Sequence, residues 1–344
     1  MKIALQQAPR GIALMIVMIA VFVLTLLAGA FAYSMKVETR LAMNANREAS
    51  DLWLGRSGVE YARYILAQEM RCPYTSLNQK WAGGPGDDCE TNGPLADVSL
   101  DNFQVCDKKI SISITNLESK ANINTADENM LRQALTLVGV DASEIPTITD
   151  SILDWIDPNA DSKIARINGA KSDYYQSLTP PYPAKNGPID DLSELLMIKG
   201  IRDQPDIYSA DYRPASFQKV DRFGQAIEEP ARTAYLVDLF TPLSSGRINV
   251  NTASATVLQL IPGVDENTAS AIIQQRDQAP FQSLNEVPVP PQIMPQLQRY
   301  GTVRGSTWAV EVTVEGASRK FYAVLRTTSP RDVPILVFYW KDVE

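Results

Sequence analysis

The chain has 344 residues, of which 45% are apolar and 21% charged, a composition typical of folded domains. Its formal net charge of −8 disfavours nucleic acid as the main partner, because phosphate binding needs clustered lysine and arginine. Histidine is absent, which excludes a Ser-His-Asp triad and any histidine-ligated metal site. An enzyme could still use paired carboxylates or a Ser–Lys dyad. Because histidine is absent, we do not expect an enzyme.

The N-terminal region predicts a membrane anchor. Residues 12–33 (IALMIVMIAVFVLTLLAGAFAY) carry no charge. As a helix rising about 1.5 Å per residue they cross a hydrocarbon core of about 30 Å. Lys2 and Arg10 precede the segment and no acidic residue does, so the short N-terminus is expected in the cytoplasm and the rest outside the membrane. The alternative is an ordinary signal peptide, cleaved near residues 28–30.

The apolar segment continues into a helical pattern. From Val37 to Leu66 apolar residues recur mainly at spacings of three and four, as on one face of a helix. The sequence therefore predicts one helix over 12–70, with 12–33 as its membrane-spanning part. Gly55 and Gly58 are its weak points, because glycine is a poor helix former. This continuity argues against removal of the apolar segment as a signal peptide.

The cysteines are Cys72, Cys89 and Cys106, all of which follow the anchor. They are too widely spaced for a CxxC zinc or redox motif. In the oxidising compartment expected here, we predict one disulfide and one remaining thiol. Cys89–Cys106 is favoured, since both cysteines flank a loop rich in Gly, Pro and Asp. The sequence does not fix the pairing, and three free thiols are the alternative.

The chain as a whole predicts an α+β fold: a long N-terminal transmembrane helix, an antiparallel sheet and a large helical insertion. The sheet domain is predicted from 71–119 and 303–344, and the insertion from 120–302. Residues 71–106 are rich in turn residues and are expected to form a loop. Alternating or apolar runs predict the strands, which cover 108–117, 308–316, 320–328 and 334–342.

The insertion contains an internal repeat. Residues 122–126 (NINTA) recur as 249–253 (NVNTA), and each copy is followed by a helical stretch and a Gly-Val turn. We expect each copy to open a helix, with Asn124 or Asn251 as the N-cap or turn residue.

The second copy is similar to the helix-hairpin-helix, or SAM-like, unit of competence-type DNA receptors. In such units the backbone amides of a Gly-rich hairpin bind phosphate. This resemblance gives the alternative function, a DNA-binding component of a DNA-uptake pilus. Against it, Asp265 and Glu266 occupy the hairpin, and Arg276 is the one basic residue of 249–287. We expect the hairpin to pack instead, with a core of Leu258, Ile261, Ile272 and Ile273.

The start of the chain resembles the type IV prepilin signature, a short basic leader ending in glycine before a long apolar helix. The matching residues are Arg10, Gly11 and Ile12. The resemblance implies that residues 1–11 are a leader, that prepilin peptidase cleaves after Gly11 and that Ile12 is then N-methylated. It also implies a pilin-like antiparallel sheet, so that 71–119 and 303–344 form a pilin-like domain. Most pilins carry glutamate at the fifth mature position, where this chain has Ile16.

The missing glutamate has a physical reading. A carboxylate in the bilayer needs a partner, and in pilins it is thought to pair with the N-terminal amine of the subunit ahead. A subunit at the tip of a fibre has no subunit ahead, so Ile16 suits the tip. K-type minor pseudopilins of type II secretion are the members that lack this glutamate.

Residues 151–195 resemble K-type minor pseudopilins most specifically, through the run Asp-Trp-Ile-Asp, an Asp-Tyr-Tyr after Gly-Ala, and a Leu-Ser-Glu-Leu. The resemblance implies a subunit at the tip of the periplasmic pseudopilus that initiates its assembly for secretion across the outer membrane. It implies I- and J-type minor pseudopilins and prepilin peptidase as partners, and a single pass through the inner membrane with the C-terminal domain in the periplasm. We expect no nucleic-acid partner and no catalytic residue.

The same stretch holds the one candidate metal site, and no other cofactor is expected. Carboxylate and amide oxygens are the ligands that Ca²⁺ prefers, and members of the resembled family hold calcium in this domain. Lys171 would oppose a cation there. The alternative is that these side chains are surface groups that cap helices. The candidate ligands are Asp154, Asp157, Asn159 and Asp161.

Overall fold

The fold is that of a computed structural model. The residues it describes are 10–69, 71–86, 99–158, 165–212, 232–317, 320–327 and 335–343. The chain divides into two compact units, Met1–Ser57 and Gly58–Glu344.

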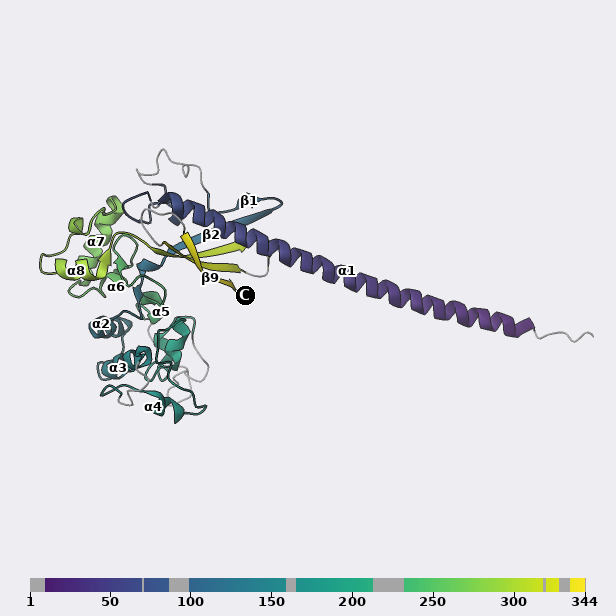
Figure 1. The fold of residues 1–344 in the computed structure, drawn as a ribbon, viewed down its shortest axis with the longest axis horizontal. Coiled ribbons are helices and arrows are strands. Elements are labelled where there is room, and N and C mark those ends of the chain that lie inside the picture. The colour runs from purple at the N-terminus through teal and green to yellow at the C-terminus, as the bar shows by residue number, and fades with distance from the viewer. Residues whose placement is uncertain are drawn as a thin grey trace, which may run out of the picture. The chain divides into compact units, whose positions relative to one another are not determined.

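Helix α1 (Arg10–Glu69) is the longest element and confirms the predicted N-terminal helix (Figure 1, purple to blue). Its residues up to Ser57 belong to the first unit and the remainder to the second. By length and composition α1 is apolar enough to cross a membrane, with a mean hydropathy of 2.9 over its most apolar window. The apolar side chains of 12–33 are exposed, because no other described element covers them.

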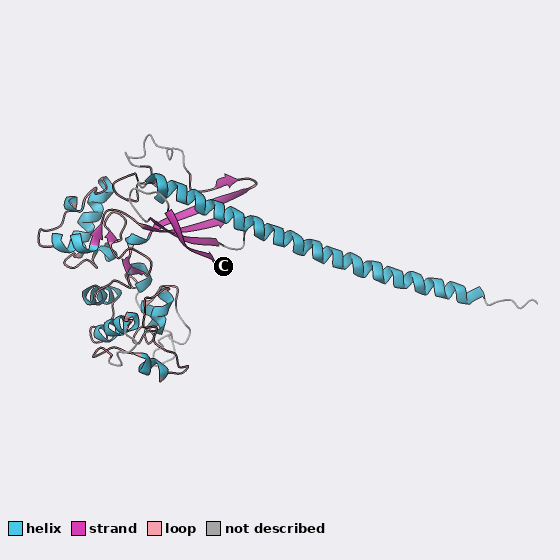
Figure 2. Cartoon of the chain, viewed as in Figure 1, coloured by secondary structure: helices cyan, strands magenta, loops and turns pink. Residues whose placement is uncertain are grey.

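The second unit contains a five-stranded antiparallel sheet, drawn in magenta in Figure 2, with the strand order β1-β2-β7-β8-β9. The predicted strands are confirmed, and β1 is an additional strand within the segment expected to be a loop. Strand β2 pairs along its length with β7, although the whole insertion separates the two in sequence. The strands are β1 Phe103–Val105, β2 Lys108–Asn116, β7 Thr307–Val314, β8 Lys320–Thr327 and β9 Ile335–Val343.

Strand β2 shows why the sheet forms. Its Ile-Ser-Ile-Ser-Ile run alternates, so Ile110, Ile112 and Ile114 are buried on one face while the serines between them lie on the other. The last turns of α1 lie against this sheet. A Cβ atom on Gly58 would stand 2.6 Å from Cγ1 of Val312, so the glycine permits a close approach of helix and strand.

The insertion lies between β2 and β7 and contains two groups of helices, α2–α4 and α6–α8 (Figure 1). Two short parallel strand pairs, β3–β4 and β5–β6, accompany them. One contiguous set of buried apolar residues, from Ala121 to Leu297, spans both groups. The helices are α2 Glu128–Val138, α3 Ile145–Ile156, α4 Ser172–Gln176, α5 Leu236–Leu239, α6 Ala255–Leu258, α7 Glu266–Gln278 and α8 Met294–Tyr300. The short strands are β3 Ala121–Asn122, β4 Phe240–Thr241, β5 Ile248–Asn249 and β6 Gly301–Thr302, and 3₁₀ turns include Leu117–Ser119 and Leu192–Met197.

The contact at Gly58 generates a prediction. Gly58→Ala should lower the free energy of unfolding by about 1–2 kcal/mol, because overpacking against Val312 outweighs the gain in helix propensity. Urea unfolding of the full chain in detergent, followed by tryptophan fluorescence, measures the change. In a Val312→Ala background the same substitution should be neutral or stabilising, and an equal loss in both backgrounds would contradict the contact.

Candidate functional site

The two asparagine turns of the sequence repeat have the same local structure. In the first, the N–H of Asn124 donates to Oδ1 of Asn122 at 2.8 Å; in the second, that of Asn251 donates to Oδ1 of Asn249 at 3.0 Å. Each turn follows a two-residue parallel strand, β3 or β5. Asn124 and Asn251 are therefore turn residues, one of the two predicted roles.

The helix N-caps stand three residues after these asparagines. Asp127 accepts from the N–H of Met130, and Ser254 accepts from that of Val257. Such side chains satisfy amide donors that have no partner within the helix.

The side chains of Asn124 and Asn251 each hold a distant backbone segment by two hydrogen bonds. The amide of Asn251 donates to the carbonyl of Phe281 at 2.9 Å and accepts from its N–H at 3.0 Å. That of Asn124 donates to the carbonyl of Ile189 at 2.9 Å and accepts from its N–H at 2.7 Å. Asparagine suits this position because one short side chain supplies both a donor and an acceptor. The repeat is thus preserved in its tertiary hydrogen bonds.

A buried carboxylate joins the insertion to the sheet. Glu118, which is 0% exposed, accepts from the backbone N–H groups of Ser245, Ser306 and Thr307, each at 3.1 Å. It also accepts from the Ser306 hydroxyl and the Asn116 amide, both at 2.8 Å. These donors lie at the end of β2, before β5 and at the start of β7. One side chain therefore connects the two points at which the chain leaves and re-enters the sheet.

Asn116 extends this connection to the second asparagine turn. Its Oδ1 accepts from the hydroxyl of Thr252 at 3.1 Å and from the side chain of Asn249 at 3.3 Å. We name Asn116, Glu118, Asn249 and Thr252 the buried polar junction. Sequence reasoning missed Glu118, because a lone glutamate between a strand and a turn carries no recognisable pattern.

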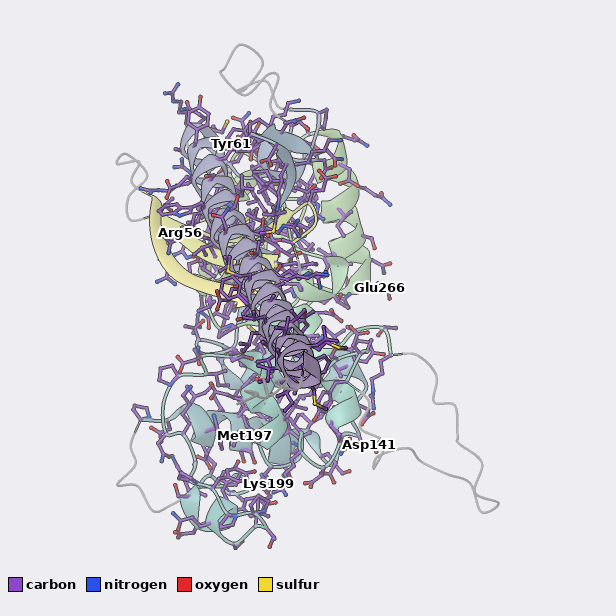
Figure 3. The ribbon with its side chains drawn as sticks, turned by 90° about the vertical axis from the view of Figure 1, so that its right-hand side faces the viewer. Arg56, Tyr61, Asp141, Met197, Lys199 and Glu266 are labelled. Carbon is purple, nitrogen blue, oxygen red and sulfur yellow. The ribbon has the colours of Figure 1, made fainter. Side chains whose placement is uncertain are left out.

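The hairpin between α6 and α7 packs as expected. Gly263 has φ +91°, a conformation that glycine adopts readily, and Asp265 caps α7 through the N–H of Thr268 at 2.8 Å. Hydrogen bonds from Thr268 lower the pKa of the Asp265 carboxyl, so the hairpin carries its negative charge at neutral pH. Glu266 lies beside it at the start of α7 (Figure 3). Of the predicted core residues, Leu258, Ile261 and Ile272 are buried and Ile273 is partly buried.

Arg276 has an internal role. Its side chain is 8% exposed, and Nη1 donates to the carbonyls of Val250 and Ala253 at 2.8 and 2.6 Å. Burial lowers the pKa of this guanidinium. Residues 249–287 are all described, and their one basic group therefore faces main-chain oxygens rather than solvent. This arrangement does not support phosphate binding at the hairpin.

The predicted calcium ligands lie beside basic groups of the same chain. Asp154, which is 2% exposed, accepts from the N–H of Arg166 at 3.0 Å. Asp157 accepts from Nζ of Lys171 at 3.2 Å. Burial raises the pKa of the Asp154 carboxyl, while the Arg166 N–H and the charges of Lys171 and Arg166 act in the opposite direction. Asn159 and Asp161 lie outside the described residues.

Within the described part of the chain, no group of three or more Asp, Glu, Cys or His side chains has the spacing to hold a metal ion. The calcium site therefore stays a prediction.

The prediction of a Cys89–Cys106 disulfide is wrong, because Cys106 is a free, exposed thiol. Cys106 has φ +55° and lies in the tight turn between β1 and β2. Because β1 draws residues 103–105 onto the sheet, Cys106 belongs to a hairpin rather than to the loop assumed from the sequence. Cys72 is the described cysteine that is disulfide-bonded, and it is buried. Cys89 lies outside the described residues.

The residues that carry the prepilin resemblance are all in α1, where Ile12 and Ile16 are exposed. Cleavage after Gly11, methylation of Ile12 and the role of Ile16 are not tested by these positions and stay predictions.

Comparison with known proteins points to one family. Two models of one family, "Type II secretion system (T2SS), protein K", match residues 111–209 and 248–299. The matched regions contain the C-terminal part of β2, both asparagine turns and the hairpin. Over these two stretches the chain is similar to the type II secretion protein K family.

Individual protein K members are distant relatives. The protein K of Pseudomonas aeruginosa is 24% identical over 294 residues, which cover 82% of this chain and 77% of that protein. The protein K of Aeromonas hydrophila is 27% identical over 201 residues, 56% of this chain and 59% of that protein. A solved GspK-GspI-GspJ complex of enterotoxigenic Escherichia coli contains a chain with the same fold, at a TM-score of 0.60 and 17% identity, covering 88% of this chain and 99% of that one.

The buried polar junction generates a prediction. Glu118→Gln should lower the free energy of unfolding by about 2–3 kcal/mol, because in either orientation the amide nitrogen would face a backbone N–H, that of Ser245 or those of Ser306 and Thr307. Urea unfolding of the full chain in detergent measures the loss. The control is Glu311→Gln, which breaks an exposed pair with Lys320 and should cost under about 1 kcal/mol. Equal effects of the two substitutions would contradict the role of Glu118.

Proposed function

We propose that this protein is the minor pseudopilin at the tip of the type II secretion pseudopilus, where it starts pseudopilus assembly for protein export across the outer membrane. The main support is the position of the insertion, which lies in sequence between the adjacent strands β2 and β7 of the sheet and has a core of its own. A body of this size on the sheet domain would obstruct a following subunit. Similarity to the protein K family supports the same role.

Anchoring by α1 is the second part of the proposal. The apolar residues 12–33 lie in the inner membrane, and the positive charges of Lys2 and Arg10 keep the leader cytoplasmic. The C-terminal unit is then periplasmic. Prepilin peptidase removes residues 1–11 and methylates Ile12. Ile16 places no carboxylate in the bilayer, which suits a subunit with no amine ahead of it.

The partners follow from the related complex. In the structure from enterotoxigenic Escherichia coli, a chain of this fold is found with GspI and GspJ. We propose that I- and J-type minor pseudopilins bind this protein in the same way, with its N-terminal helix packed among theirs.

The third part of the proposal is that the protein has a structural rather than an enzymatic role. The acidic groups that sequence alone offered for chemistry have structural partners: the carboxylate of Asp154 binds a backbone amide, and that of Asp157 binds Lys171. The DNA-uptake alternative has no support, because the hairpin is acidic and its arginine is buried.

The assembly predicts co-purification. The full chain, expressed with I- and J-type pseudopilins and extracted in detergent, should elute with both in one complex by size-exclusion chromatography with light scattering. The same chain expressed with the major pseudopilin alone is the control and should elute separately, because a tip subunit is expected to join through its sister minor subunits. Elution as a monomer beside both I- and J-type partners would contradict the proposal.

The anchor predicts a defined mature N-terminus. Mass spectrometry of the purified protein should find a chain that begins at N-methylated Ile12. Gly11→Val should block cleavage and leave the leader attached. Gly29→Ala is the control, since a Cβ at Gly29 meets nothing within 4 Å and processing should be unchanged. A mature chain that begins just after residue 30 would indicate an ordinary signal peptide instead.

A further inference from the structure

An acidic face of α3 lies under a loop that follows it. Asp150 and Asp154 stand one helical turn apart, and Asp157 follows the end of the helix. The N–H of Asn168 donates to Oδ2 of Asp150 at 3.2 Å, and the N–H of Arg166 donates to Oδ2 of Asp154 at 3.0 Å. The loop therefore supplies backbone donors to two of the three carboxylates.

The loop approaches so closely that one position must be glycine. A Cβ atom on Gly169 would lie 2.0 Å from Oδ2 of Asp154. With that oxygen already bonded to Arg166, little space is left at the carboxylate for a metal ion, whose oxygen ligands for calcium stand at about 2.3–2.6 Å.

Lys171 supplies the central positive charge. It is 8% exposed, and its Nζ donates to Oδ2 of Asp157 at 3.2 Å and to the main-chain carbonyl of Asp154 at 3.2 Å. A carboxylate and a backbone carbonyl are oxygen ligands of the kind that Ca²⁺ takes. The ammonium group is therefore bonded to two atoms that a metal ion at this place would use.

Two further basic side chains lie at this segment. Nε of Arg166 lies 3.8 Å from Oδ1 of Asp154. Nζ of Lys199 donates to the carbonyls of Asn168 and Gly169 at 3.3 and 3.4 Å, and thereby holds the loop in place; Figure 3 labels this lysine. Lys171 and Arg166 thus contact carboxylates of this segment, and Lys199 contacts the backbone of the loop beside them.

We infer that the ammonium group of Lys171 is a resident cation that occupies the place of a divalent metal ion, so that this part of the protein folds and remains folded without calcium. The inference reverses the expectation of a calcium site at Asp154 and Asp157.

The charge of Lys171 should therefore be essential, and its replacement by an acidic group should create a metal requirement. Removing one partner of an ion pair leaves an uncompensated charge, here on the partly buried carboxylate of Asp157. Lys171→Met keeps most of the volume and removes that charge. Lys171→Glu replaces the ammonium with a further oxygen ligand beside Asp157, which is the chemistry that binds calcium.

The test is the thermal unfolding of the full-length protein in detergent, followed by tryptophan fluorescence in excess EDTA and in about 1 mM CaCl₂. Trp155 is buried on α3 and reports on this region. The wild-type Tm should agree within about 1 °C in the two solutions. Lys171→Met should lower the Tm by roughly 5 °C or more. Lys171→Glu should be destabilised in EDTA and regain about 5 °C in CaCl₂.

The control is Lys320→Glu, which reverses the charge of an exposed lysine paired with Glu311 and should show no response to calcium. A wild-type Tm that falls in EDTA and recovers in CaCl₂ would overturn the inference, as would a Lys171→Met protein as stable as wild type. Titration calorimetry of the wild-type protein with CaCl₂ decides the matter even if the variants do not fold. Heat from binding there would refute a resident ammonium, and its absence would support one.

Discussion

The carboxylate of Glu118 lies out of contact with solvent between the sheet and the insertion. An ionised carboxylate is costly to bury unless donors surround it, and five hydrogen bonds reach this one. They come from the end of β2, from the segment before β5 and from the start of β7. All can form together only when the chain leaves the sheet and returns to it at one place. The pairing of β2 with β7 across the whole insertion meets this condition.

The two asparagine turns of the insertion stabilise their short strand pairs in the same way. Each two-residue parallel strand pair is too short to be stable alone. In each copy an asparagine side chain acts like one more peptide group, and it satisfies the N–H and carbonyl of a distant residue, Ile189 or Phe281. Helices capped three residues later then bury a common core. The repeat is therefore a repeat of hydrogen-bonding geometry as well as of sequence letters.

At the sites suggested by resemblance, two buried cations bind groups among the described residues that a ligand could otherwise use. Arg276 binds the carbonyls of its own turn, and Lys171 binds a carboxylate and a carbonyl of the acidic segment. A phosphate at the hairpin would meet Asp265 and Glu266 without a cation to offset them. Arg276 and Lys171 thus make contacts within the chain that stabilise the fold. This agrees with a subunit that acts by assembly.

The sequence by itself determined the elements whose cause is local. An uncharged stretch of membrane-spanning length fixes the helix at 12–33, alternation fixes strands such as Lys108–Asn116, and the repeated Asn-x-Asn-Thr-Ala fixes two turns. Tertiary structure alone decided the rest. The role of Glu118, the partner of Lys171 and the free state of Cys106 depend on which other parts of the chain lie beside them. No spacing records those contacts, because hydrogen bonds across the fold are set by how the chain returns on itself.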